Sequence, residues 1–570
     1  VPKHIADRAL DIWGEETYDK ISTNPYFLTA FEANLKLLDE FAINRLAFKL
    51  DAPERLEGYV KMALYDGFNN GHTCLKESKL NAKLKKQLGS KMLAEKALQH
   101  AYSNGTAIKV SDLVQVGSMN LIETTTAENI LKLKNKHSEQ IPLHTLESHI
   151  HNYEKRVGFE LTQEQRNAVI MACQSSLMLL TGGAGCGKTT VLEAICFVLE
   201  QLRIVSEIRL MALAGKAAQR ITETTGREAS TIAGFLYVDA LKIASYSAFI
   251  IDESSMVDTL SLHRILKRIP ANGRIIYAGD PEQLPPVGMG LTLHEMVNMD
   301  LPQTHLSVVK RQSKASGIPM IANAIRNFPD DERDIEFAEY AGAGSGVSFV
   351  EAEPNDMQQA VLNVYEQLGG SGCSADIVVL SPMRSTRDGV LAINNVIHEQ
   401  FMDKVENRLR FQNDEFGSIG VNINNRPVCM GELLMSKRND YKKRIRNGSV
   451  GKVIGFDADE QTITLDFNDN HVDFDYCEML TLEHASAMTV HKSQGSQYKR
   501  VIVVVKDCQM LDRHLLYTAV TRATEQVVLI GSKKVFYKQL KVSKTSERNT
   551  LLQHYFDQLT AQELPMESLA

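Results

Sequence analysis

The chain has 570 residues, of which 44% are hydrophobic and 23% charged, and its formal net charge is −7. This length allows about three or four domains, and the composition excludes disordered and fibrous classes. The negative charge does not exclude a nucleic-acid binder, because binding needs a local basic groove rather than a basic total.

The length of the apolar runs and the spacing of the cysteines indicate the cellular compartment of the protein. No run reaches the roughly 18 residues of a membrane span, and no signal peptide opens the chain, so we expect a cytoplasmic protein without a membrane partner. The first residue is Val1 rather than Met, which predicts that a natural start is missing. The eight cysteines show no CxxC pair and no Cys/His cluster of metal-ligand spacing. They favour a reduced protein without structural zinc.

Residues 1–105 are predicted to form a helical domain. Apolar side chains recur at the 3.6-residue period in "ANLKLLDEFAINRLAFKL" and "SKMLAEKALQHAY". We predict a connecting helical segment over residues 106–150 and an α/β lobe over residues 151–345.

A phosphate-binding loop is predicted in that lobe. The apolar strand Leu177–Leu180 runs into "GGAGCGKTT", and helix-periodic residues follow, which is the context that a Walker A motif requires. Glycines let backbone N–H groups wrap the phosphates, and the helix N-terminus adds partial positive charge. We expect Lys188 to reach the β and γ phosphates of ATP and Thr189 to ligate Mg²⁺. A glycine turn before a core helix is the alternative. The predicted ATP-binding residues of this loop are Gly182, Gly183, Ala184, Gly185, Cys186, Gly187, Lys188, Thr189 and Thr190.

Two further strands of the lobe end in polar residues. "AFIIDESSM" ends its apolar run at Asp252 and Glu253, which places carboxylates at the sheet edge where ligands bind. Asp252 would hold Mg²⁺, and Glu253 would polarise the attacking water. "RIIYAGDPEQLPPVG" carries Gln283, which could sense a γ-phosphate. Solvated acids and a surface turn are the alternatives.

A second α/β lobe without a phosphate loop is predicted over residues 346–400 and 481–570. Its strand signals include "ADIVVLSP" and "RVIVVV". Two lobes with one phosphate loop suggest a nucleotide between them, with an arginine supplied in trans to the γ-phosphate. Arg522, in "TAVTRA", and Arg311, in "VVKRQ", are the candidates; surface salt bridges are the alternative for both.

Residues 401–480 are predicted to form a small β-barrel inserted in the second lobe. Short strands such as "GKVIGF" and "QTITLDF" alternate with Gly, Asn and Asp. Before them, "SKRNDYKKRIRNGS" packs Lys and Arg around Tyr441. This segment could guide the phosphates of a nucleic-acid strand, or be a solvated loop.

In chain order, "GGAGCGKTT", "IIDESSM", "GDPEQLPPVG", "VVKRQ", "MTVHKSQGSQ" and "LLYTAVTRA" resemble the motif series of superfamily 1 helicases. The match is to the RecD-like branch, whose members move 5′→3′ on single-stranded DNA, and it covers about 161–532. The resemblance implies that Gln165, in "LTQEQRNAV", recognises adenine. It also implies DNA contacts by Lys216, Thr231, Thr489 and His491, and a place for Gly495 in the cleft between the lobes.

The resemblance also defines the flanking segments. The N-terminal region resembles a helix-hairpin-helix domain, but its turn Glu32-Ala33-Asn34 lacks the glycine, so a purely structural role is an open alternative. The family carries an SH3-like barrel where residues 401–480 lie. Relatives also have a β-hairpin wedge before the Asp-Glu motif, whereas this chain has only the short "AGFLYVDALKIASYS". Ala233 stands where relatives usually carry histidine.

The whole pattern predicts two RecA-like, doubly wound parallel-sheet lobes, a helical N-terminal domain and an SH3-like insertion. The expected function is an ATP- and Mg²⁺-dependent DNA helicase, monomeric, acting on single-stranded DNA and duplex junctions, with protein partners available to the N-terminal domain. Two alternatives stay open: a nucleic-acid-stimulated ATPase switch or assembly subunit that does not unwind, and a helicase acting on RNA.

Overall fold

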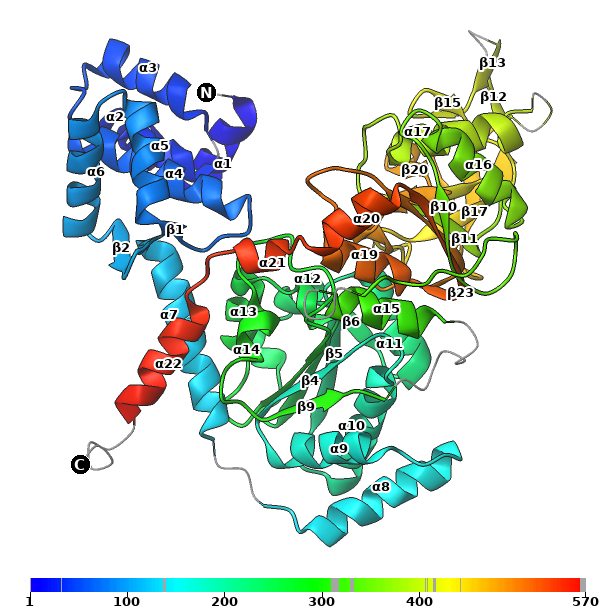
Figure 1. The fold of residues 1–570 in the computed structure, drawn as a ribbon. Helices are drawn as coiled ribbons and strands as arrows, with labels where there is room; N and C mark the ends of the chain where they lie inside the picture. Colours follow the sequence, from blue (N-terminus) through cyan, green and yellow to red (C-terminus); the bar gives the residue numbers. More distant parts are fainter. Residues whose placement is uncertain are drawn as a thin grey trace.

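The computed structural model describes residues 2–31, 33–136, 140–308, 317–328, 333–404, 406, 408–413, 417–440 and 442–563 (Figure 1). None of the helices in these ranges is long and apolar enough to cross a membrane.

The N-terminal domain is helical, as expected. Its helices are α1 (Lys3–Trp13), α2 (Thr17–Thr23), α3 (Leu35–Leu46), α4 (Pro53–Phe68), α5 (Glu77–Leu88) and α6 (Lys91–Ser103). Asn34 caps α3, because its Oδ1 accepts hydrogen bonds from the backbone N–H groups of Lys36 and Leu37. Asn34 therefore has a structural role in the turn that takes the place of the glycine turn of a helix-hairpin-helix. Glu32 of that turn lies outside the described residues.

The connection to the first lobe is not purely helical, which corrects the expectation for residues 106–150. Strands β2 (Ala107–Val110) and β3 (Leu113–Val116) form an antiparallel hairpin that also pairs with β1 (Leu75–Lys76). "AIKVSDLVQV" supports strands, and Ser111 adopts φ +56° in the two-residue turn. Helices α7 (Gly117–Lys134) and α8 (Leu143–Val157) follow.

The first lobe is a parallel sheet covered on both faces. Its strand order is β6-β5-β7-β8-β4-β9. One face packs against α8–α11 and the other against α7, α12, α13, α14 and α22 (Leu552–Glu563). The strands are β4 (Leu177–Gly182), β5 (Glu207–Ala212), β6 (Ala229–Thr231), β7 (Ser247–Asp252), β8 (Arg274–Gly279) and β9 (Gln303–Leu306). The helices not yet given are α9 (Gln163–Gln174), α10 (Lys188–Leu202), α11 (Gly215–Thr225), α12 (Ile232–Leu236), α13 (Thr259–Leu266) and α14 (Thr292–Met296).

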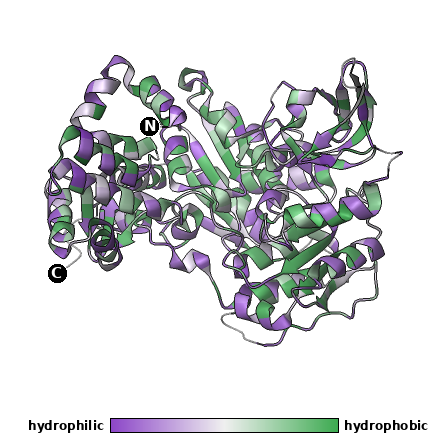
Figure 2. Cartoon of the chain, turned by 90° about the horizontal axis from the view of Figure 1, so that it is seen from above, coloured by the Kyte–Doolittle hydropathy of each residue, from purple (hydrophilic) through white to green (hydrophobic). Residues whose placement is uncertain are grey.

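The second lobe repeats this architecture with the parallel order β10-β23-β22-β11-β21. Its strands are β10 (Gly346–Glu351), β11 (Ile377–Ser381), β21 (Ala487–Thr489), β22 (Tyr498–Val505) and β23 (Ala523–Gly531). One face packs against α15 (Ile318–Asn327), α19 (Arg513–Val520) and α20 (Lys533–Leu540), and the other against α16 (Met357–Gln367) and α17 (Val390–Ile397). Figure 2 shows the strands of the lobes coloured as hydrophobic, which agrees with burial of parallel sheets on both faces.

The segment between β11 and β21 contains a small β-module with its own core. Its main sheet is antiparallel, in the order β19-β18-β17-β16-β20. These strands are β16 (Leu433–Ser436), β17 (Val450–Asp457), β18 (Thr462–Asp466), β19 (His471–Phe474) and β20 (Leu482–His484), and α18 (Tyr476–Met479) precedes the last one. Two hairpins join β12 (Arg410–Asn413) to β13 (Gly417–Gly420) and β14 (Asn422–Ile423) to β15 (Arg426–Pro427). Likeness to an SH3 barrel stays a prediction, and β20 extends the module beyond residue 480.

Two segments belong to other cores than expected. Helix α15, expected in the first lobe, packs into the core of the second. Conversely, α21 (Lys544–Glu547) leads to α22 (Leu552–Glu563), which returns from the second lobe to pack beside α7 (Figure 1). Tyr555 fixes α22 there, because its hydroxyl donates to Gln115 Oε1 at 2.9 Å and accepts from Asn120 Nδ2 at 2.8 Å.

Two carboxyl groups are buried where α7, α14 and the start of α22 meet. Glu123, on α7, has no exposed surface, and Glu295, on α14, is 8% exposed. Glu295 Oε1 accepts a hydrogen bond from the backbone N–H of Gln553. Burial raises the pKa of both carboxyls, and the charge of Glu295 raises the pKa of Glu123 further. The folded protein therefore holds protons here that the unfolded chain releases.

We expect Glu123→Gln to be more stable than the wild type at pH values above the ordinary pKa of a glutamate side chain. Since the raised pKa makes the folded state bind more protons than the unfolded state, stability falls as pH rises from the unfolded towards the folded pKa. The slope is about 1.4 kcal/mol per pH unit for one group. Urea unfolding of the wild type and the variant between pH 5 and pH 8, read against a Glu128→Gln control on the same helix, measures this. Parallel pH profiles for wild type and Glu123→Gln would contradict it.

Candidate nucleotide site between the two lobes

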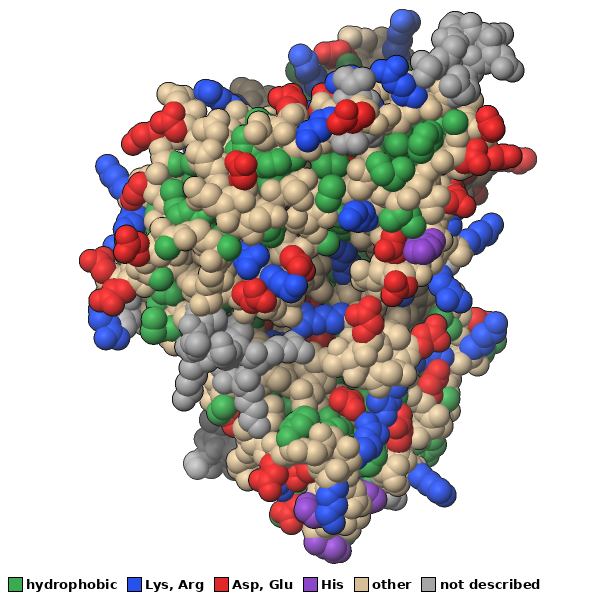
Figure 3. Space-filling model, turned by 90° about the vertical axis from the view of Figure 1, so that its right-hand side faces the viewer, with side chains coloured by type: hydrophobic (Ala, Val, Ile, Leu, Met, Phe, Trp, Pro, Cys, Tyr) green, Lys and Arg blue, Asp and Glu red, His purple; other side chains and the backbone are tan. Residues whose placement is uncertain are grey.

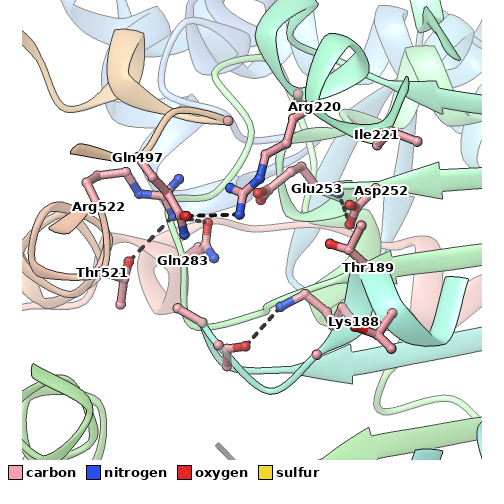
Figure 4. Close-up of a pocket in the computed structure, with 17 residues that line it drawn as sticks. Lys188, Thr189, Arg220, Ile221, Asp252, Glu253, Gln283, Gln497, Thr521 and Arg522 are labelled. Atoms are coloured by element: carbon pink, nitrogen blue, oxygen red, sulfur yellow. Dashed lines mark hydrogen bonds between the residues drawn. The ribbon is translucent and has the colours of Figure 1, made fainter. Parts of the chain in front are cut away.

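The phosphate loop lies between β4 and α10. Gly185 and Gly187 adopt φ +81° and +84°, in the left-handed region that favours glycine. A Cβ on Gly187 would lie 2.6 Å from Gln165 Nε2 and would displace that side chain. Lys188 Nζ donates to the carbonyls of Gly182 and Gly183 at 2.6 and 3.1 Å, across the mouth of the loop (Figure 4). This lysine and the N-terminus of α10 make a phosphate site.

The two acids lie opposite the loop, at the end of β7 (Figure 4). Glu253 adopts φ +52°, a strained conformation for a residue with a Cβ. Asp252 Oδ1 accepts a hydrogen bond from the backbone N–H of Glu253 at 2.8 Å. Burial and the neighbouring Glu253 raise the pKa of Asp252 to about 6, although Lys188 opposes the shift. Asp252 and Thr189 line the same pocket, and they are the oxygen ligands suited to Mg²⁺.

The second lobe supplies the other wall of the pocket. Arg522 follows α19, and its Nη2 donates to Gln283 Oε1 of the first lobe at 3.2 Å. Both side chains are buried, at 4% and 3% exposure, and Arg522 Nε is fixed on Thr518 O at 3.1 Å. The guanidinium is therefore held at the pocket by residues of both lobes, and its action in trans on a phosphate stays a prediction.

Further contacts between the lobes were not predicted. Tyr517 Oη donates to Asp280 Oδ2 at 2.8 Å, and Thr518 Oγ1 accepts from Leu284 N at 3.0 Å. Arg220 Nη2, on α11, donates to Gln497 Oε1 at 3.0 Å, and both residues line the pocket (Figure 4). A signal existed for Arg220, which lies one helical turn after Lys216.

The predicted ATP-site residues differ in where they lie. All loop residues except Gly182 and Cys186 line the pocket with Asp252, Glu253, Gln283, Gly495 and Arg522. Cys186 is buried under the loop. Gln165 closes a capping box with Thr162, and its Nε2 donates to Cys186 O at 3.5 Å, so its adenine contact stays a prediction. Arg311 lies outside the described residues.

The predicted DNA-contact residues lie on both lobes. Lys216, in the first turn of α11, lines a groove with residues 495–498 of the second lobe and Arg444–Arg446 of the β-module. Burial lowers the pKa of Lys216 to about 8. Arg220, Gly495 and Gln497 line both this groove and the nucleotide pocket. Figure 3 shows a hollow across the molecule with Lys and Arg side chains in it beside acidic ones.

The other three predicted DNA-contact side chains are Thr231, Thr489 and His491. The two threonines make local hydrogen bonds, and His491 is affected by burial. Thr231 Oγ1 caps α12 by accepting from Gly234 N at 3.0 Å. Thr489, at the end of edge strand β21, accepts from Lys492 N at 3.3 Å, and burial lowers the pKa of His491. Gly495 adopts φ +76°, and a Cβ there would lie 2.8 Å from Ala217 N. The loop thus touches the first lobe at a point that only glycine allows.

Comparisons with known proteins match three parts of the chain. Residues 1–74 match the ATP-dependent RecD2 DNA helicase HHH domain, 160–345 an AAA domain, and 484–530 the UvrD-like helicase C-terminal domain. The chain is 31% identical to the ATP-dependent RecD2 DNA helicase of Deinococcus radiodurans, over 70% of this chain and 53% of that protein. It is 28% identical to RecBCD enzyme subunit RecD of Mycolicibacterium smegmatis, over 66% of this chain and 71% of that one. The Pif1 helicase from Bacteroides, solved with ADP-AlF3 and ssDNA, aligns over 71% of this chain and 98% of its own, with 19% identity and a TM-score of 0.42.

We expect Arg522→Ala to lower the rate of ATP hydrolysis on the order of 10³-fold while leaving nucleotide affinity nearly unchanged, because the guanidinium stabilises charge that develops in the transition state. Steady-state ATPase kinetics and binding of a fluorescent ADP analogue separate the two effects. Arg387→Ala, an exposed arginine of the same lobe, is the matched control. Equal loss of binding and turnover would show that Arg522 only holds the pocket together.

Proposed function

We propose that this chain, which belongs to the RecD-like branch of the superfamily 1 helicases, is an ATP- and Mg²⁺-dependent motor. It would move 5′→3′ on single-stranded DNA and separate duplex. The chain spans about half of the RecD2 protein it matches, 53% of its length, so the activity of that whole protein is carried over here only as a proposal.

The observation that carries the proposal is a pocket with reactive groups from two lobes. Lys188, Thr189 and Asp252 would hold the phosphates and Mg²⁺, and Glu253 would position the attacking water. Gln283 and Arg522 already touch across the cleft, so a γ-phosphate entering beside them would alter their contact. Arg311 remains a second candidate for contact with that phosphate.

Coupling to nucleic acid would run through residues 489–497. Gly495 and Gln497 face the nucleotide pocket and also line the groove that contains Lys216. A change in cleft closure would therefore move the groove wall. Thr231, Thr489 and His491 are proposed as further contacts with the strand.

A second function, an ATPase switch or assembly subunit that does not unwind, is favoured by one feature. Among the described residues, the segment between β6 and β7 forms α12 and the short 3₁₀ helix Ala240–Lys242 rather than a β-hairpin. Yet this segment exposes three large apolar side chains, of which Tyr237 (90% exposed) and Leu241 (93% exposed) are the most exposed. Arg268 Nη1 donates a hydrogen bond to Val238 O at 2.6 Å and so holds the backbone of the segment in place.

Strand displacement on partial duplexes tests the motor function. With ATP and Mg²⁺, we expect displacement from a 5′-tailed duplex only, and none by Lys188→Ala. Displacement from a 3′ tail would overturn the polarity. If neither opens while single strands stimulate hydrolysis, the protein is a translocase or switch; greater stimulation by RNA than by DNA oligomers would favour the RNA-directed alternative.

The double variant Tyr237→Ala/Leu241→Ala tests whether the short segment separates strands. The Tyr237 ring could stack on a terminal base pair, a contact worth about 1–3 kcal/mol per base, and Leu241 would add apolar contact. We expect unwinding to slow on the order of 10-fold or more, with DNA-stimulated hydrolysis unchanged. The matched control is Tyr476→Ala, an aromatic residue of the β-module that is 51% exposed. Wild-type unwinding by the double variant would refute the role.

A further inference from the structure

Two histidines and a glutamate converge in a buried cluster away from the nucleotide pocket. His398 Nδ1 lies 2.7 Å and His484 Nδ1 2.8 Å from the same oxygen, Glu432 Oε1. The three residues are 3%, 5% and 4% exposed, and their candidate ligand atoms all lie within 4.8 Å of one another. Three such groups rarely share a buried site without a cation or protons between them.

The cluster joins the second lobe to the β-module. His398 opens a single turn of π-helix (His398–Met402) directly after α17, a distortion that is frequent at functional sites. Glu432 directly precedes β16, and His484 ends β20. Glu432 lies 34 residues after His398 and 52 before His484. Motif spacing therefore could not reveal the cluster, and the fold assembles it.

Neighbouring backbone groups orient the cluster. Glu432 Oε2 accepts from the backbone N–H of Cys429 at 3.1 Å, which turns Oε1 toward the histidines. His484 Nε2 lies 3.4 Å from Ile423 O, where it can donate to that carbonyl. In a neutral ring with its hydrogen on Nε2, the lone pair of Nδ1 would face a carboxylate oxygen, and these two acceptors need a cation between them.

We propose that His398, Glu432 and His484 form a site for a divalent transition-metal ion of the zinc class. Two imidazoles and one carboxylate are an established zinc ligand set, with bonds of about 2.0–2.2 Å and a fourth position available for water. Binding would separate the ligand atoms slightly from their present hydrogen-bonding distances. The ion would fix the β-module on the second lobe. A zinc site here would revise the expectation, drawn from cysteine spacing, that structural zinc is absent.

The competing arrangement is a proton bridge, in which both Nδ1 atoms donate to Glu432 and His484 is an imidazolium. His398 Nε2, which is buried without a hydrogen-bond partner among the described residues, is left unsatisfied in both arrangements. The two arrangements differ in one measurable property, the uptake of metal.

The test uses the full chain without a histidine tag. The chain is stripped with a chelator and dialysed, and Zn²⁺ is then titrated in competition with a fluorescent zinc indicator. We expect one equivalent per chain and a rise in the melting temperature. Glu432→Gln and His484→Gln should each lose that equivalent. His471→Asn is the matched control, because His471 faces Asp466 at 3.7 Å in the same module but is 61% exposed.

Zinc K-edge absorption of the loaded wild type should show two imidazole ligands and oxygen donors. No stoichiometric uptake by the stripped wild type would overturn the proposal in favour of the proton bridge, even if the variants misfold. Equal uptake by wild type, Glu432→Gln and His484→Gln would overturn it as well, because the ion would then bind elsewhere.

Discussion

The docking of helix α19 against the loop that follows β8 holds the ATP-site geometry together. Tyr517 and Thr518 bind Asp280 and Leu284 through side-chain hydrogen bonds, and His514 Nδ1 lies 2.9 Å from Glu282 O. These contacts bring the carboxyl ends of the first lobe's strands against the second-lobe residues that directly precede β22 and β23. Without them, Arg522 would belong to one lobe and the phosphate loop to another, and neither would form a complete site.

The buried polar groups of this interface depend on one another for hydrogen bonds. Burying hydroxyls and a guanidinium is costly unless each finds a partner, and in this interface each partner comes from the other lobe or from α19 itself. A set of hydrogen bonds that all depend on one docking geometry favours a few discrete arrangements over gradual sliding. A nucleotide can select among such arrangements by the contacts it makes in each.

Much of this could be predicted, because the relevant signals are local. The loop before Lys188, the acids after β7 and Gln283 after β8 each follow an apolar strand directly, so the sequence orders them along one sheet edge. The strands β2 and β3 were missed although their side chains alternate, since the neighbouring helical pattern dominated. Arg220–Gln497 and the buried cluster around Glu432 unite residues far apart in the chain, and only the folded topology brings such pairs together. The placement of α15 and α22 was predicted wrongly for the same reason. The apolar face of a helix does not indicate which sheet the helix will cover.

The return of α22 to α7 has a consequence for how the molecule could be divided. The chain passes between the lobes after β9 and again after α20, so two peptide connections link them. One proteolytic cut in either connection would leave the lobes joined by the other. A truncated protein ending before Leu551 would instead uncover the apolar surface of the first lobe that Leu552 and Phe556 now fill, and exposed surfaces of this kind promote aggregation. Helix α22 thus sets the shortest version of the chain that should remain soluble.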